Sequence, residues 1–69
     1  MMVYVLLFTD NIDDFTSFLG VYASKANAIE GAHKWFDQGE EERSQEETEN
    51  GISIYTTDGE YYISARPVE

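Results

Sequence analysis

The sequence has no cysteine, one proline, one histidine and only four basic residues among 69. Without cysteine, neither a disulfide framework nor a thiolate metal site can form. The four Lys and Arg face 14 Asp and Glu, which gives a formal net charge of −10. Nucleic acids and anionic membrane surfaces both attract clustered Lys and Arg. We therefore expect no direct binding to DNA or RNA and no docking on a membrane.

Long hydrophobic runs are also absent. The longest one, residues 3–8, is far shorter than the roughly 20 residues that a membrane-spanning helix needs. It also lacks the basic segment and small-residue cleavage site of a signal peptide. We expect a cytoplasmic protein, in the host cytoplasm if the chain is encoded by a phage.

The sequence lacks the groups from which most catalytic sites are built. His33 is the only imidazole, and it lies beside Lys34 on the polar side of a predicted helix. No serine stands in a nucleophile motif, and no glycine-rich phosphate loop follows a strand. Residues 10–14 resemble a calcium loop only superficially, because Ile12 occupies a ligand position and the turn glycine is missing. We expect a protein that is not an enzyme and that has no cofactor and no metal site.

What the sequence does contain is enough hydrophobic material for one folded domain. One Trp, five Tyr and four Phe contribute to a hydrophobic fraction of 42%. That content argues against disorder despite the high net charge. A chain of this length buries only about 60% of its unfolded surface, so we expect one small domain, residues 1–69, with a thin core.

The first half of the chain predicts two strands and a helix. Residues 2–9 are apolar on both faces, which is typical of a central strand or of one whose second face meets a partner. Residues 18–23 form the second strand after a polar loop. Ser24 is a suitable N-cap for a helix over residues 25–37. Gly31 in that helix indicates a close approach to the sheet, and Gly39 is a suitable stop. The predicted apolar stripe of the helix consists of Ala28, Ile29, Ala32, Trp35 and Phe36.

The last third of the chain predicts a hairpin. Residues 52–57 and 60–66 flank Asp58-Gly59, which is typical of a two-residue type I′ turn. In that register Ile54 lies opposite Ile63 on the core face, and Tyr55 lies opposite Tyr62 on the other face. The predicted fold is therefore α+β, in the order β-β-α-β-β, with a four-stranded antiparallel sheet and one helix packed on one face.

An acidic connection at residues 39–50 joins the helix to the hairpin and contains no hydrophobic residue. It is either a solvated linker or a recognition surface, and it could be helical, extended or disordered. A helix would place Glu42, Glu46 and Glu49 on one ridge, whereas a strand would space the carboxylates along its edge. Either arrangement approaches the density of phosphates along a nucleic acid. The candidate protein-binding residues are Asp37, Glu40, Glu41, Glu42, Glu46, Glu47 and Glu49, with Tyr55 and Tyr62 as a second surface.

Two resemblances bear on function. Residues 19–29, Leu-Gly-Val-Tyr-Ala-Ser-Lys-Ala-Asn-Ala-Ile, are similar to a strand-to-helix passage of short bacterial and phage proteins. They also resemble the middle of peptidoglycan-binding sporulation-related repeats, which have a second helix where this chain has its acidic tract. In size, acidity and lack of cysteine and catalytic residues, the chain resembles small acidic phage-encoded inhibitors of the anti-defence or host-takeover type. No motif is shared with them, so no residue role carries over.

These observations lead to two alternative functions. The first is an acidic protein that inhibits a host protein by occupying a basic, nucleic-acid-binding surface, most simply that of a nucleic-acid-binding enzyme. The second is a small homo-oligomeric structural or regulatory module, such as a homodimer, whose interface is the uncovered sheet face around Tyr4, Tyr55 and Tyr62.

Overall fold

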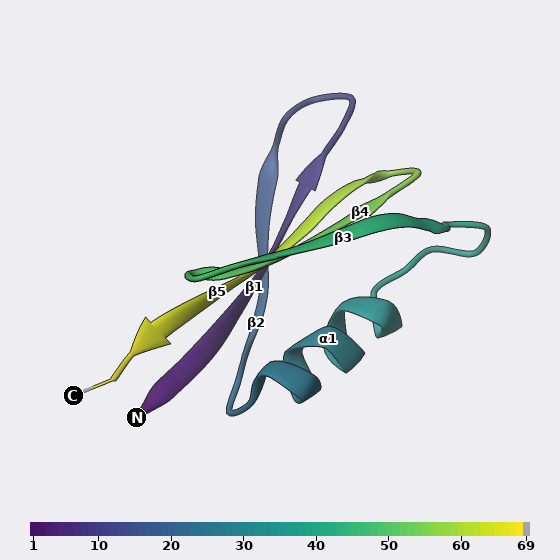
Figure 1. The fold of residues 1–69 in the computed structure, drawn as a ribbon. Helices are drawn as coiled ribbons and strands as arrows, with labels where there is room; N and C mark the ends of the chain where they lie inside the picture. The colour runs from purple at the N-terminus through teal and green to yellow at the C-terminus, as the bar shows by residue number, and fades with distance from the viewer. Residues whose placement is uncertain (69) are drawn as a thin grey trace.

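The computed structural model describes residues 1–68, and this part of the chain has an α+β fold (Figure 1). One helix lies on one face of a five-stranded antiparallel sheet, whose strand order is β2-β1-β5-β4-β3. No helix in the described residues has the length and hydrophobicity to cross a membrane. In chain order the elements are β1 (Met2–Asp10), β2 (Thr16–Tyr22), α1 (Lys25–Lys34), β3 (Glu42–Thr48), β4 (Gly51–Thr56) and β5 (Gly59–Pro67).

Strand β1 lies between β2 and β5, as its two apolar faces predicted. Its neighbour β5 runs antiparallel to it along its whole length, so Met2 and Pro67 lie opposite each other at one end of the sheet (Figure 1). The backbone N–H of Val68 donates to the carbonyl of Met1 at 2.8 Å. The long pairing between β1 and β5 thus forms the centre of the fold.

The core lies between the sheet and α1. Four aliphatic side chains on the helix side of the sheet are fully buried, namely Leu6, Ile52, Ile54 and Ile63. Ala28 and Ala32 of α1 are completely buried against them, as the apolar stripe predicted. The predicted close approach at Gly31 is confirmed, because a methyl group there would collide with the ring of Tyr22. Small residues therefore allow the helix to sit directly on the sheet.

The ends of α1 are partly as expected. Ser24 is the N-cap, and its hydroxyl accepts the backbone N–H of Asn27 at 3.1 Å. The helix ends at Lys34, three residues before the predicted end, because the N–H of Trp35 turns back to the carbonyl of Ala32 at 3.0 Å. Trp35 is 51% exposed, so its assignment to the buried stripe was wrong.

The hairpin of β4 and β5 forms, but its predicted register was wrong by two residues. Ile52 lies opposite Ile63 and Ile54 opposite Tyr61, so the core face is preserved. The turn is not type I′, because the described residues have positive φ only at Asp14 and Gly39. Instead, the Thr56 hydroxyl accepts the N–H groups of Asp58 and Gly59, both at 3.2 Å.

Gly59 consequently belongs to strand β5 and not to the turn. A methyl group at this position would collide with the carbonyl oxygen of Thr9 on β1. The glycine that is typical of a turn is needed here for the close approach of two strands. The turn therefore moves one residue toward the N-terminus.

The predicted count of four strands was also wrong, because most of the acidic connection at 39–50 forms a fifth strand, β3. This strand pairs antiparallel with β4 through a short turn at Glu49 and Asn50. An edge strand needs no buried side chain, since its backbone hydrogen bonds to one neighbour hold it in place. Hydrophobic patterning therefore gives no sign of such a strand.

Candidate protein-binding surface

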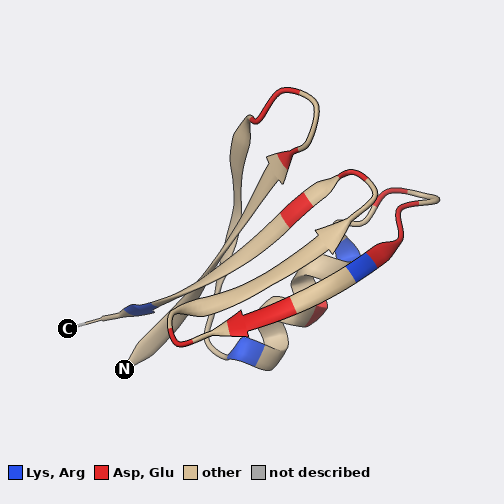
Figure 2. Cartoon of the chain, turned by 45° about the horizontal axis from the view of Figure 1, so that its top comes forward, with Lys and Arg blue, Asp and Glu red and all other residues tan. Residues whose placement is uncertain are grey.

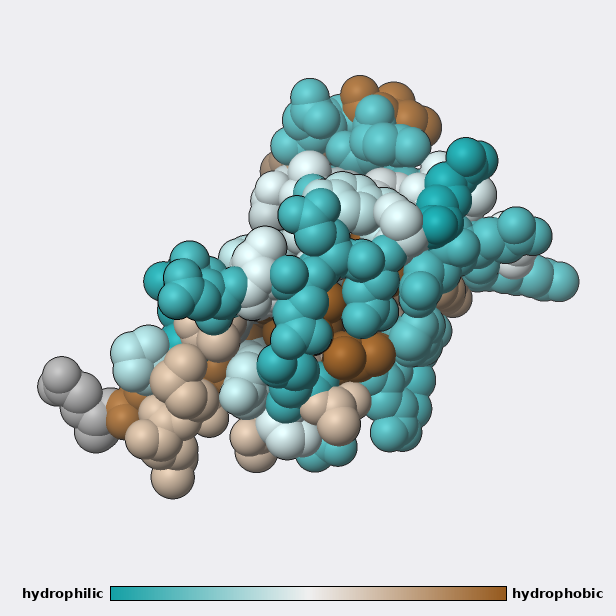
Figure 3. All heavy atoms as spheres, viewed as in Figure 1, coloured by the Kyte–Doolittle hydropathy of each residue, from teal (hydrophilic) through white to brown (hydrophobic). Residues whose placement is uncertain are grey.

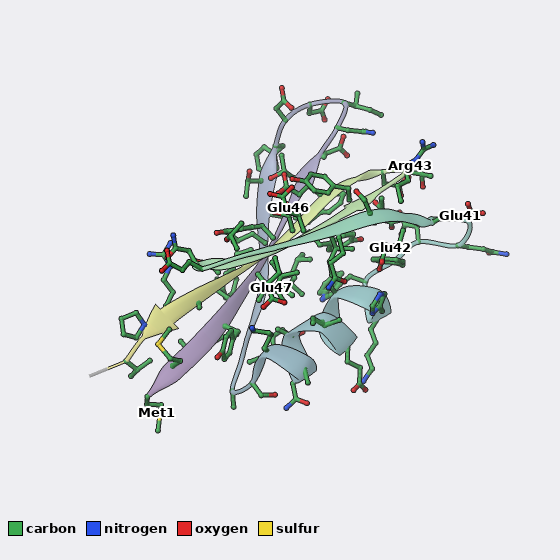
Figure 4. The ribbon with its side chains drawn as sticks, viewed as in Figure 1. Met1, Glu41, Glu42, Arg43, Glu46 and Glu47 are labelled. Atoms are coloured by element: carbon green, nitrogen blue, oxygen red, sulfur yellow. The ribbon has the colours of Figure 1, made fainter. Side chains whose placement is uncertain are left out.

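Strand β3 is one edge of the sheet, and all seven of its residues are exposed. A register shift at Arg43 places Glu42 on the same side of the strand as Glu47, which lies opposite the core residue Ile52. Figure 4 shows both of these glutamates directed toward the helix and Glu46 directed away from it. The helical alternative for this segment, with Glu42, Glu46 and Glu49 on one ridge, was therefore wrong.

The two helix-side glutamates form ion pairs with α1. The Lys25 ammonium lies 3.1 Å from Oε2 of Glu47, and Nε2 of His33 lies 3.0 Å from Oε1 of Glu42. All four side chains are more than one third exposed, so each pair is worth no more than about 1 kcal/mol. The two ion pairs link the edge strand to the helix. They also give two of the predicted binding residues, Glu42 and Glu47, a partner within the chain.

Three other carboxylates have no ion-pair partner among residues 1–68. These outer acids are Glu41, Glu46 and Glu49. Glu41 immediately precedes β3 and Glu49 follows it, and all three side chains are exposed. In Figure 4, Glu41 lies at the outer end of the strand, away from the sheet. The outer acids are thus the carboxylates that can reach a partner without first breaking a contact inside this chain.

Glu40, by contrast, is a structural residue. It accepts hydrogen bonds from the Thr56 hydroxyl at 2.6 Å, from the Tyr61 hydroxyl at 3.2 Å and from the Asp37 backbone N–H at 2.8 Å. Thr56 and Tyr61 are both buried, so these bonds satisfy hydroxyl groups at the margin of the core. Glu40 therefore joins the connection after α1 to the β4–β5 hairpin, and its carboxylate is not an open surface group.

Asp37 and Asp58 lie beside Glu40. One carboxylate oxygen from each of the three residues lies within 4.8 Å of the others. Desolvation, followed by the negative charges of Glu40 and Asp37, raises the pKa of Asp58 above its ordinary value. Burial and the Glu40 carboxylate likewise raise the pKa of Tyr61. Three carboxylates at this separation could hold a cation, but both oxygens of Glu40 already accept hydrogen bonds.

The sheet face opposite the helix is the second predicted surface. Tyr62 lies on this face opposite Leu7 and Ser53, and Tyr55 lies diagonally from it, not directly opposite as predicted. Tyr4 was assigned to this face incorrectly, because it packs against the core on the helix side. Phe18 and Val21 of β2 were not predicted for this surface; they are 64% and 53% exposed and lie opposite Leu7 and Val5 on the open face. Their apolar character in an edge strand was the available signal.

Charge and hydrophobicity are distributed unevenly over the molecule. In Figure 2 acidic segments lie along β3 and the connection that leads into it, and others lie at the β1–β2 loop and on β5, whereas β2 itself carries no charged residue. Figure 3 shows hydrophobic atoms at the tip of the β1–β2 hairpin. A second group of hydrophobic atoms lies in the middle of the view and is surrounded by hydrophilic atoms. The two edges of the sheet thus differ sharply in chemistry.

Comparison with protein-family models, curated proteins and solved structures gives no match.

Proposed function

We propose that this protein is a non-enzymatic acidic binding protein. It occupies a basic, nucleic-acid-binding surface of a host protein and thereby inhibits it, as a phage-encoded anti-defence or host-takeover inhibitor would. The observation that supports the proposal most directly is strand β3, an exposed sheet edge that carries carboxylates on both sides and is flanked by more of them. Clustered charge of one sign attracts an oppositely charged groove and speeds encounter.

The geometry of a strand suits this role. Residues on one side of a strand recur about every 6.6 Å, and the two sides point in opposite directions, so β3 presents two separated rows of side chains. Glu42 and Glu47 lie in the row on the helix side and Glu46 in the other. Carboxylates held on and beside a hydrogen-bonded strand lose less main-chain entropy on binding than carboxylates on a flexible linker.

The two groups of acids have different parts in this proposal. The outer acids Glu41, Glu46 and Glu49 engage Lys and Arg of the target directly. Glu42 and Glu47 must first exchange their partners His33 and Lys25, so they contribute less net free energy to binding. Neutralising the outer acids is therefore the sharper test.

The experiment is an affinity capture from a bacterial lysate with elution at low and then high salt. Wild-type protein is compared with E41Q/E46Q/E49Q and with D13N/E30Q/E60Q, which removes the same number of charges away from β3. We expect the wild type and the second variant to capture the same nucleic-acid-binding protein, which salt releases, and the first variant to lose it. Retention by E41Q/E46Q/E49Q, or equal loss from both variants, contradicts the proposal.

One observation favours a second candidate, a homo-oligomeric structural or regulatory module. The open sheet face carries apolar side chains with no covering layer in residues 1–68, including Tyr55 and Phe18, which are 37% and 64% exposed. Light scattering over a range of concentrations tests this candidate. A single-chain mass at every concentration would remove it.

A further inference from the structure

We propose that the β2 edge pairs with β2 of a second copy, so that the two sheets form one continuous ten-stranded sheet. Strand β2 pairs with β1 on one side only, and no strand lies beside its other edge in residues 1–68. An edge strand of this kind presents unpaired N–H and C=O groups that can template a further strand. This inference is independent of the proposed inhibitor function, and it places self-association at the β2 edge and not on the open sheet face.

Charge directs self-association to this edge. The other edge, β3, carries three glutamates within seven residues, so two copies would repel each other there. Strand β2, with the sequence Thr-Ser-Phe-Leu-Gly-Val-Tyr, carries no charge, although the chain as a whole has a net charge of −10. Charged residues on an edge are a recognised protection against edge pairing, and β2 lacks this protection.

Exposed hydrophobic side chains lie along both sides of the same edge. Phe18 and Val21 lie on the open face, 64% and 53% exposed. On the helix side, a pocket of about 330 Å³ lies between β2 and α1; its aromatic lining is Tyr22 and Trp35, the latter 51% exposed, and its polar lining is Asn27, Glu30 and Lys34. Pairing of two β2 edges would shield these side chains from water on both faces of the joined sheet.

The bulge in β2 determines the register. Phe18 and Val21 face the same side although they are three residues apart, because Phe18 pairs with Leu7, Gly20 with Leu6 and Val21 with Val5. Residues paired between antiparallel strands must face the same side of the sheet. We consider two β2 strands that pair antiparallel about a two-fold axis, with every opposed pair facing the same side. In that register Phe18 lies opposite Val21 of the second copy, and Ser17 lies opposite Tyr22 of the second copy.

The same register brings no like charges together along the joint, because β2 carries no charged residue. The two acidic β3 edges meanwhile lie at the far ends of the joined sheet. Nine strand spacings of about 4.8 Å separate them by about 43 Å, several times the Debye length of about 8 Å at physiological ionic strength. Their mutual repulsion is therefore small.

Cysteine cross-linking tests both the interface and the register, since the natural chain contains no cysteine. F18C and V21C are prepared as single variants, mixed, oxidised and run on a non-reducing gel. Cα atoms of directly opposed residues in antiparallel strands are about 4.5–5.5 Å apart, within disulfide range. We expect the mixture to form a covalent dimer, and each variant alone to form much less, because identical positions are three residues out of register.

Y55C is the matched control, because Tyr55 is exposed on the same sheet face but lies on β4, away from the edge. Cross-linking of Y55C at the level of the mixture, or no dimer from the mixture, overturns the proposal. Light scattering gives a second measurement without cysteine. Wild type is expected to have twice the 7.9 kDa chain mass, V21K the single-chain mass, and Y55K the wild-type mass. A wild type that stays monomeric at millimolar concentration also overturns the proposal.

Discussion

Two neighbouring glutamates have entirely different environments. Glu40 is half-buried and accepts three hydrogen bonds, two of them from buried hydroxyl groups. Glu41 is exposed, and its backbone exchanges hydrogen bonds with Thr57 while its carboxylate has no ion-pair partner in residues 1–68. The sequence presents them as equal members of one acidic run, yet only the second can serve as an open binding residue.

The first prediction compares these two positions. Glu40→Ala removes the main acceptor of the Thr56 and Tyr61 hydroxyl groups, and we expect it to lower the free energy of unfolding by about 1–3 kcal/mol. Glu41→Ala is expected to change it by no more than about 0.5 kcal/mol. Urea unfolding followed by circular dichroism measures both. Equal effects of the two substitutions would show that the Glu40 hydrogen bonds do not contribute to stability.

The second prediction concerns Asp58, whose pKa is raised by desolvation and by the charges of Glu40, Asp37 and Asp10. A raised pKa means that the folded state binds the proton more tightly than the unfolded chain does. The tighter proton binding stabilises the folded state. This stabilisation is fully present below the ordinary Asp pKa of about 3.9, and it is lost as the pH rises through the raised pKa of the folded state. At neutral pH the ionised Asp58 therefore opposes folding.

We accordingly expect Asp58→Asn to raise the urea midpoint at neutral pH, and this gain to shrink as the pH falls toward about 4. Asp13→Asn, in the exposed β1–β2 loop, is the control. A gain that is independent of pH, or a loss of stability at neutral pH, would show that the repulsion between the carboxylates is not what Asp58 contributes.

At the scale of elements, predictability follows the hydrophobic pattern. Strand β1, the helix and the β4–β5 hairpin bury apolar side chains at regular spacing, and each was found near its predicted position. Strand β3 buries no side chain, so its sequence has no hydrophobic pattern that predicts a strand. It is held in place by backbone pairing with β4. The β4–β5 register was missed for a related reason, since the Thr56 hydroxyl and the lack of space at Gly59 decide the turn.

The third prediction concerns the beginning of α1. Ser24→Ala removes the hydroxyl that accepts the Asn27 N–H, and we expect a loss of about 1 kcal/mol in the free energy of unfolding. Ser44→Ala, on the exposed β3 strand, is the control and should have little effect. Ser24→Asp should retain most of the stability, because its carboxylate can accept the same hydrogen bond. If alanine and aspartate behave alike, the cap does not stabilise the helix.

At the scale of the whole molecule, the sheet separates an acidic edge from an uncharged, apolar edge. The fourth prediction follows from the repulsion within the acidic edge. Raising NaCl from about 0.01 M to about 0.15 M shortens the Debye length from about 30 Å to about 8 Å, so the melting temperature should rise. The variant E41Q/E46Q/E49Q should melt higher at low salt and respond less to added salt. An equal response of both proteins would place the repulsion elsewhere.

The sequence by itself determined the features that depend on composition and local pattern: an α+β fold, a central first strand, a capped helix and a strongly acidic segment. These features depend on the local chemistry of neighbouring residues and on the periodicity of hydrophobic residues, and both can be read from one sequence. Only the tertiary structure decided that the acidic segment is an edge strand, that Glu40 faces inward while Glu42 and Glu47 pair with the helix, and that Phe18 and Val21 remain exposed. The physical reason is that edges, registers and ion pairs arise between segments distant in sequence, where backbone pairing and available space, not hydrophobic spacing, determine the arrangement.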